Sequence, residues 1–319
     1  MTEKTLLLGE HKNVVGIVTE PDLGARCADR PAVLLLNAGL IHRVGPNRIY
    51  VKLARQLAQV GYLTLRIDLS GIGDSQPRPG HVSIEKSSIA DVTQAMDYLA
   101  EAYGSQSFVL MGHCAGAFHA FRTANQDRRV SGCVLINPEG GEPDWKEYDR
   151  RRKLATYQSN VFGRKKLWDP ARWKRLLTGQ VHISRLLQTI FKDLLGYRAA
   201  NVLFQIRARV SPQAPSEYDR ALFTIESVVR KMDSVPVRAL LIYYEGSTSL
   251  ERTRIGVGRQ LRRLSSTGQL TLQIIPQADH LFTLVESQRR LTRVVLEWLQ
   301  AQTPQASPQV PPPATRLPG

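Results

Sequence analysis

The chain has 319 residues, 42% of them hydrophobic, and a formal net charge of +15 at pH 7. This size allows one large α/β domain with an insertion, and no apolar stretch approaches the roughly 20 residues that span a bilayer. The first residues lack the basic and then apolar layout of a signal peptide, which predicts a cytoplasmic protein. The three cysteines, Cys27, Cys114 and Cys133, have no metal-like spacing and are expected to be free thiols.

Short apolar strands alternate with amphipathic helices in the first part of the chain. Residues 5–8 and 14–19 predict an antiparallel edge hairpin joined by a polar turn. Further strands are predicted at residues 31–37, 62–68, 108–111 and 130–136. Helices are predicted at residues 47–60 and 83–103, and from the turn at 112–116 to about residue 125. Apolar strands separated by amphipathic helices favour a mostly parallel sheet that is covered on both faces.

This alternation stops after the sixth strand, where helical patterns rich in Arg, Lys, Trp and Leu take over. Residues 141–235 contain 19 Lys and Arg against 10 Asp and Glu, which is more than half of the net charge of the whole chain. The sequence therefore predicts a basic helical cap, inserted between the sixth and seventh strands.

The α/β pattern resumes with strands at residues 237–243 and 270–275 and with helices around 253–264 and 287–302. The predicted core thus comprises residues 1–136 and 236–302, and the cap comprises residues 137–235. The proline-rich tail, residues 303–319, cannot bury a core and is predicted to be disordered.

The most informative motif is Gly112-His113-Cys114-Ala115-Gly116, which directly follows an apolar strand. A nucleophile with a glycine two residues to either side, between a strand and a helix, is typical of a nucleophile elbow. The glycines have a steric reason, since the strained turn brings the strand and helix backbones close together. The central side chain is a thiol where most elbows have a hydroxyl, which favours acyl transfer and thioester chemistry.

With three further segments, this motif makes the chain resemble α/β-hydrolase-fold proteins over roughly residues 5–302. These segments are Asn37-Ala38-Gly39, the glycine loop from Asp68 to Ser75, and Ala278-Asp279-His280 after the last strand. More narrowly, the chain is similar to cysteine-elbow hydrolase-like proteins encoded near exopolysaccharide or secondary-metabolite genes. The resemblance implies an α/β-hydrolase fold with a helical cap after the sixth strand.

In this fold the chain order is nucleophile, acid, histidine. The resemblance therefore implies that Cys114 is the nucleophile and that His280 is the base. Ala115, together with Gly39 or Leu40, would supply the backbone N–H groups of the oxyanion hole. His113 and His42 are the histidines expected to line the pocket.

The acid is expected after the seventh strand, where Ser247 stands at the position at which an aspartate would be expected. Glu245 is the nearest carboxylate and is the predicted acid, with Glu139 and Glu251 as alternatives. A Cys–His dyad could also suffice, because a thiol with a pKa near 8.5 needs less activation than a hydroxyl.

No cofactor or metal is expected. The loop Gly71-Ile72-Gly73 lacks the third glycine and the helix start of a dinucleotide site. Nucleic acid is not an expected partner either, because the basic runs lie in a helical insertion without a recognised groove-reading motif.

Three functions are compatible with these residues. The first is a Cys-dependent acyl transferase or thioesterase with an acyl-Cys114 intermediate, in which the basic cap docks a coenzyme A or acyl carrier protein substrate. The second is a hydrolase of small esters or lactones, as in the cysteine-elbow dienelactone hydrolases. The third is an inactive scaffold that has kept the fold, which would agree with the missing aspartate at Ser247.

Overall fold

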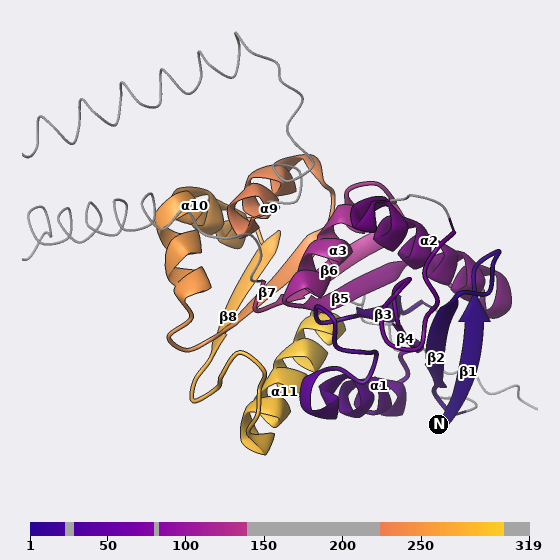
Figure 1. Cartoon of the computed structure of the whole chain (residues 1–319). Coiled ribbons are helices and arrows are strands. Elements are labelled where there is room, and N and C mark those ends of the chain that lie inside the picture. Colours follow the sequence, from indigo (N-terminus) through magenta and orange to yellow (C-terminus); the bar gives the residue numbers. More distant parts are fainter. Residues whose placement is uncertain (23–28, 80–82, 139–223, 303–319) are drawn as a thin grey trace, which may run out of the picture. The chain divides into compact units, whose positions relative to one another are not determined.

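A computed structural model of the protein describes residues 1–22, 29–79, 83–138 and 224–302 (Figure 1). The chain divides into two compact units, and the described residues belong to the first, which joins Met1–Gly140 with Thr224–Gly319. Most of the predicted cap, the predicted tail and Cys27 lie outside the described residues.

Eight strands form one sheet in the order β1-β2-β4-β3-β5-β6-β7-β8. β1 and β2 form the predicted antiparallel hairpin at one edge, β2 pairs antiparallel with β4, and every other pair is parallel. The mostly parallel sheet expected from the sequence is thus confirmed. The strands are β1 Thr2–Leu8, β2 Val14–Glu20, β3 Ala32–Leu36, β4 Thr64–Ile67, β5 Phe108–His113, β6 Val130–Ile136, β7 Arg238–Tyr244 and β8 Leu270–Ile275.

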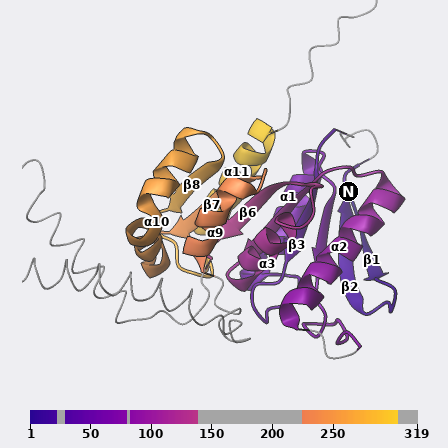
Figure 2. The ribbon, with the colours of Figure 1, turned by 90° about the horizontal axis from the view of Figure 1, so that it is seen from above.

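Helices cover both faces of the sheet. α1 and α11 lie together on one face, and α2, α3, α9 and α10 lie on the other (Figures 1 and 2). Among the described residues, the α-helices are α1 Ile49–Gln59, α2 Ile84–Tyr103, α3 Ala115–Ala124, α9 Ile225–Lys231, α10 Thr248–Ser266 and α11 Val285–Gln302, and the 3-10 turns are η1 Pro46–Arg48 and η2 Met232–Ser234.

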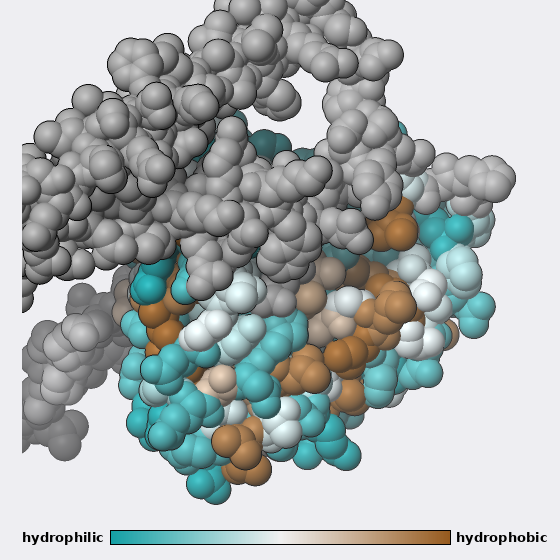
Figure 3. Space-filling view, turned by 60° about the vertical axis from the view of Figure 1, so that its left-hand side comes forward, coloured by the Kyte–Doolittle hydropathy of each residue, from teal (hydrophilic) through white to brown (hydrophobic). Residues whose placement is uncertain are grey.

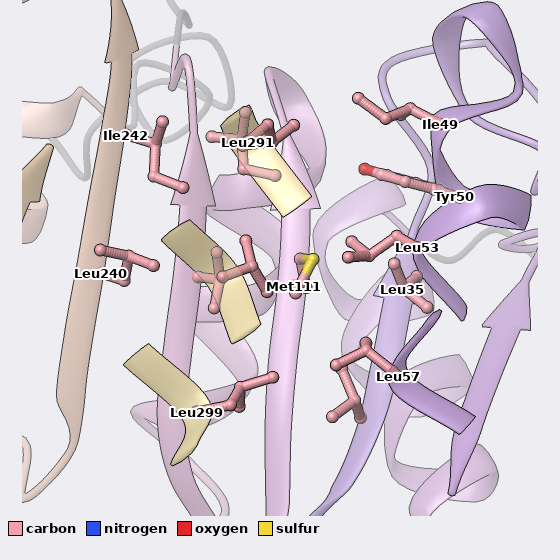
Figure 4. Packing of buried hydrophobic residues seen from close by; sticks show 14 of the residues in the cluster. Leu35, Ile49, Tyr50, Leu53, Leu57, Met111, Leu240, Ile242, Leu291 and Leu299 are labelled. Atoms are coloured by element: carbon pink, nitrogen blue, oxygen red, sulfur yellow. The ribbon is translucent and has the colours of Figure 1, made fainter. Parts of the chain in front are cut away.

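The alternation of side chains along the central strands explains why both faces are covered. In β3, for example, Val33 and Leu35 point toward α1 and α11, whereas Leu34 lies on the opposite face and is also buried. Figure 4 shows how the first of these faces packs, with Met111 of β5 between side chains of α1 and of α11. A strand that is buried on both faces must be apolar throughout, which is the pattern seen in the sequence.

Helix α10 begins at Thr248, five residues earlier than predicted. Ser247 is its N-cap, and the Ser247 hydroxyl accepts a hydrogen bond from the backbone N–H of Leu250 at 3.3 Å. The residue at the position where an aspartate was expected is thus buried as a helix cap. Helix α9, within the segment predicted as the cap, contacts α3 and α10.

The loops that follow β3 and β4 are joined through one buried carboxylate, that of Asp68. This carboxylate accepts hydrogen bonds from Asn37 Nδ2 at 2.9 Å and from the backbone N–H of Asp74 at 3.1 Å, and it forms an ion pair with Arg43. A Cβ atom at Gly73 would lie 2.4 Å from Asp68 Oδ2, so only glycine fits there. The glycine loop therefore wraps a carboxylate of the chain itself.

Arg43 also pairs with Asp74, which provides a matched control for the buried pair. The Asp68 side chain is 0% exposed and that of Asp74 is 68% exposed. We expect Asp68→Asn to lower the free energy of unfolding by about 3 kcal/mol, because Arg43 loses its buried counter-charge. Asp74→Asn should leave the urea midpoint almost unchanged, because an exposed pair is screened by solvent. Equal losses in the two variants would contradict this account.

Candidate active site

Cys114 lies between β5 and α3 in a conformation that L-residues rarely adopt. Its backbone angles are φ 54° and ψ −119°, and it is the N-cap residue of α3. Its N–H donates to the carbonyl oxygen of Ile136 in β6 at 2.9 Å, and its side chain is half-buried. Strain of this kind persists only where the surrounding structure holds it in place.

The two glycines of the motif make this turn possible. A Cβ atom at Gly112 would lie 2.0 Å from the carbonyl carbon of Gly116. A Cβ atom at Gly116 would lie 2.3 Å from the carbonyl oxygen of Asn37, at the end of β3. The backbones of β5, α3 and the loop after β3 therefore touch, which is the steric reason inferred from the sequence.

The residues predicted to form the oxyanion hole lie on both sides of the contact between α3 and the loop after β3. Ala115 is the first residue of α3, where backbone N–H groups have no acceptor within the helix and the helix dipole favours an anion. Gly39 has a φ of 58°, and a Cβ atom there would meet nothing within 4 Å. Leu40 is 88% exposed. The contact of Asn37 with Gly116 brings this loop next to the elbow.

His280 lies in the loop between β8 and α11, next to the residue that precedes Cys114. The ring centroids of His280 and His113 are 4.8 Å apart, and the ring of Tyr244 meets that of His280 edge-on at 6.1 Å. His113 is only 2% exposed, so its ring faces His280 within the protein. The other predicted pocket histidine, His42, is exposed in the loop after β3.

The sequence did not single out Asn137, which connects three parts of this site. Its Nδ2 donates to the carbonyl oxygen of His280 at 2.8 Å, and its Oδ1 accepts from the N–H of Tyr244 at 3.0 Å. Its own N–H donates to the carbonyl oxygen of Ile242 at 2.8 Å. It is fully buried with a φ of 41°, a conformation that asparagine tolerates better than most residues. An asparagine at the end of a strand and before a proline was the only sequence signal.

Tyr50 is a second residue that the sequence did not indicate. Its hydroxyl accepts a hydrogen bond from the backbone N–H of His113 at 2.9 Å, and burial raises the pKa of this tyrosine. Gly45 makes room for the ring, since a Cβ atom there would lie 2.7 Å from it. The last residue of β5 is thus held from the side of α1.

The predicted acids lie at different places. Glu245 is exposed, and its Oε2 accepts a hydrogen bond from the backbone N–H of Gln277 at 3.2 Å, three residues before His280. Glu251 is exposed on α10, and Glu139 lies outside the described residues. The structure therefore connects Glu245 with the loop of His280 through the backbone.

Asp279 stabilises that loop from within. Its Oδ1 accepts from the N–H of Leu281 at 2.9 Å and from that of Thr283 at 3.0 Å. Burial opposes its ionisation, but these hydrogen bonds outweigh burial and hold the pKa of the Asp279 carboxyl below its ordinary value.

Apolar side chains are exposed on both loops beside the elbow. The large exposed residues of these loops are Leu40, Leu281 and Leu284, with Val285 at the start of α11. Figure 3 shows apolar surface, in brown, among hydrophilic residues on one face of the described part of the protein. Across residues 1–22, 29–79, 83–138 and 224–302, no three His, Cys, Asp or Glu side chains gather as metal ligands, and no helix has the length and hydropathy of a membrane span.

Gly112, whose constraint is steric, can be compared with Gly104, whose constraint is a positive φ with open space around a Cβ. We expect Gly112→Ala to lower the free energy of unfolding by at least about 3 kcal/mol, because its Cβ would overlap the backbone of Gly116. Gly104→Ala is the control, since Gly104 has a φ of 68° and open space around a Cβ, and it should cost about 1 kcal/mol. The free energies of unfolding are measured by urea denaturation. Similar losses in the two variants would contradict this account, because they would mean that the backbone of Gly116 moves away from the new Cβ at little cost.

The two described cysteines should differ in reactivity. Cys133 in β6 is fully buried, and burial raises the pKa of its thiol to about 12. We therefore expect iodoacetamide at pH 8 to alkylate Cys114 and not Cys133 in the folded protein, and both in urea, as measured by peptide mass spectrometry. Alkylation of Cys133 in the native state at the rate of Cys114 would contradict this arrangement.

A protein-family model described as serine aminopeptidase, S33, matches residues 30–189, which is half of the chain. No curated protein matches the sequence. The matched segment includes the elbow at residues 112–116. The family is described by a serine, whereas the central residue of the elbow in this chain is Cys114.

Solved structures with the same architecture share little sequence with this chain. A dienelactone hydrolase from Anabaena variabilis has a TM-score of 0.53 and 15% identity, covering 94% of this chain and 97% of that one. An α/β serine hydrolase homologue from Coxiella burnetii has a TM-score of 0.51 and 12% identity, covering 94% and 98%. A thermophilic esterase from Thermogutta terrifontis has a TM-score of 0.50 and 17% identity, covering 95% and 100%. The protein thus has the α/β-hydrolase fold and belongs to the serine aminopeptidase S33 family.

Proposed function

We propose that the protein hydrolyses a small carboxylic ester or lactone through Cys114, and that it is a cysteine-elbow member of its family. The observation that carries this proposal is the strained backbone of Cys114 at the end of β5, with the loop of His280 packed against the preceding residue. The names of two similar structures, an esterase and a dienelactone hydrolase, support an ester as the substrate class.

In the proposed reaction His280 accepts the proton of the Cys114 thiol, and the thiolate attacks the carbonyl carbon of the ester. The alcohol leaves with the proton from His280, and an acyl-Cys114 thioester remains. His280 then takes a proton from a water molecule, which attacks this thioester. The carboxylic acid leaves, and the proton returns to the sulfur of Cys114.

Backbone N–H groups would stabilise the negative charge that develops on the carbonyl oxygen. Ala115 provides one donor at the start of α3, and Gly39 or Leu40 provides the other. The exposed apolar side chains of Leu40 and Leu281 favour a substrate with an apolar group beside the reacting carbonyl.

Glu245 is the proposed acid, and its support for the base acts through the loop, because its carboxylate binds the backbone of Gln277. Glu251 and Glu139 are the alternatives. If Glu245 only supports the loop, its removal should lower turnover less than the removal of His280 does.

The thiol itself favours a second candidate, a thioesterase or acyl transferase. Attack of a thiolate on a thioester exchanges one thioester for another, so little energy is lost in forming acyl-Cys114. The basic segment between residues 141 and 235 would then dock an anionic donor such as coenzyme A or an acyl carrier protein.

Mass spectrometry and turnover assays on p-nitrophenyl esters, lactones and acyl-coenzyme A thioesters separate these possibilities. We expect Cys114→Ala to abolish the acyl adduct and turnover, and His280→Ala to lower turnover by roughly 10²–10⁴-fold. Glu245→Gln should lose less, with Glu251→Gln and Glu139→Gln as matched comparisons. Ester turnover that survives in Cys114→Ala would refute the nucleophile assignment. A preference for thioesters would select the second candidate, and no turnover of any substrate would favour an inactive scaffold.

A further inference from the structure

The loop that carries His280 is held by side-chain N–H groups from other elements. Asn47 Nδ2, in η1, donates to the carbonyl oxygen of Leu281 at 3.1 Å. Gln288 Nε2, in α11, donates to the carbonyl oxygen of Phe282 at 2.8 Å. These bonds fix the carbonyl groups that follow His280, and neither of them involves the imidazole ring.

The carbonyl of His280 itself accepts two such bonds. Asn137 Nδ2 donates to it at 2.8 Å, and His113 Nε2 lies 2.7 Å from it. Because a carbonyl oxygen can only accept, His113 must carry a proton on Nε2 to form this bond. His113 and Asn137 come from the ends of the neighbouring strands β5 and β6.

His113 differs from the other donors because it is bonded directly in sequence to the proposed nucleophile. Its backbone N–H is fixed by the Tyr50 hydroxyl at 2.9 Å, and its ring lies 4.8 Å from that of His280. One buried residue thus connects the backbone of Cys114 with the backbone of His280. A rigid link of this kind sets the distance between the two reacting side chains.

We propose that His113 is a positioning residue, which holds the His280 loop so that the imidazole reaches the Cys114 thiol. The proposal rests on the proposed function, in which His280 takes the thiol proton. Proton transfer needs heavy atoms about 2.6–3.2 Å apart, and a misplacement of about 1 Å can cost on the order of 100-fold in rate.

Loss of His113 should displace the loop and not unfold it. The carbonyl of His280 keeps its second donor, Asn137, so no buried acceptor is left without a partner. The expected signature is therefore a lower kcat with little change in KM and in thermal stability.

Three substitutions at position 113 and one control test this inference. His113→Gln keeps an N–H donor that reaches the position of Nε2, His113→Asn has the same donor on a shorter side chain, and His113→Phe keeps a flat ring without a donor. His119→Gln is the control, because it removes another imidazole, half-buried on α3, five residues after Cys114. Turnover of p-nitrophenyl acetate and the pH profile of Cys114 alkylation by iodoacetamide are measured for each.

We expect kcat to fall about 100-fold in His113→Phe and His113→Asn, with KM within about twofold, and to recover to within about 10-fold of wild type in His113→Gln. The pH profile of Cys114 alkylation should change in the first two, because the displaced imidazole no longer accepts the thiol proton. His119→Gln should match the wild type in both measurements.

Equal behaviour of the Gln, Asn and Phe variants would overturn the proposal, as would an unchanged alkylation profile in His113→Phe. If the Phe variant does not fold, the comparison of Gln with Asn decides. The alkylation profile needs no substrate, so it tests the link between His113 and Cys114 even if the wild type hydrolyses no ester. Ester turnover that is the same in wild type and Cys114→Ala would refute the proposed function, and the alkylation profile would still test the link between His113 and Cys114.

Discussion

The backbone contact among β3, β5 and α3 is the constraint on which the site depends. Gly112 lies against Gly116, and Gly116 lies against the carbonyl oxygens of Leu36 and Asn37, closer than any side chain would permit. Strain at a residue such as Cys114 costs of order 1–3 kcal/mol and must be offset by its surroundings. Here β5 is hydrogen-bonded on one side to β3 and on the other to β6, and it is buried on both faces. The sheet therefore holds the elbow as a rigid unit.

Unusual backbone conformations gather around this unit. Among the described residues other than glycine, positive φ angles occur at Asn47, Arg48, Cys114, Asn137, Gln277 and Phe282, and also at Lys12 in the edge hairpin. Most of the first group belong to the elbow, to the His280 loop or to residues that bind that loop. Side-chain amides and the His113 imidazole donate to the carbonyl groups of the His280 loop, so these acceptors have partners and the loop is fixed from several elements.

Much of this arrangement could be predicted from the sequence, because apolar strands, amphipathic helices and the glycine pair at 112 and 116 are local signals. The predicted strand at residues 31–37, for example, is observed at Ala32–Leu36. Asn137 could not be recognised, since its partner His280 lies 143 residues away and only the fold brings them together. The start of α10 was missed because Ser247 was compared with a catalytic aspartate, whereas its hydroxyl serves as a helix cap. The role of His113 likewise depends on a contact between distant segments, and the acid remains a prediction.

Side chains from other elements bind the His280 loop at its backbone, mainly at the carbonyl groups of His280, Leu281 and Phe282, and a backbone carbonyl is present whatever the side chain. The shape of the loop is therefore largely independent of the side chain at position 280. The side chain that is proposed to react and the bonds that shape the loop are therefore separate features. A substitution at position 280 would remove the proposed base and leave the backbone bonds of the loop in place.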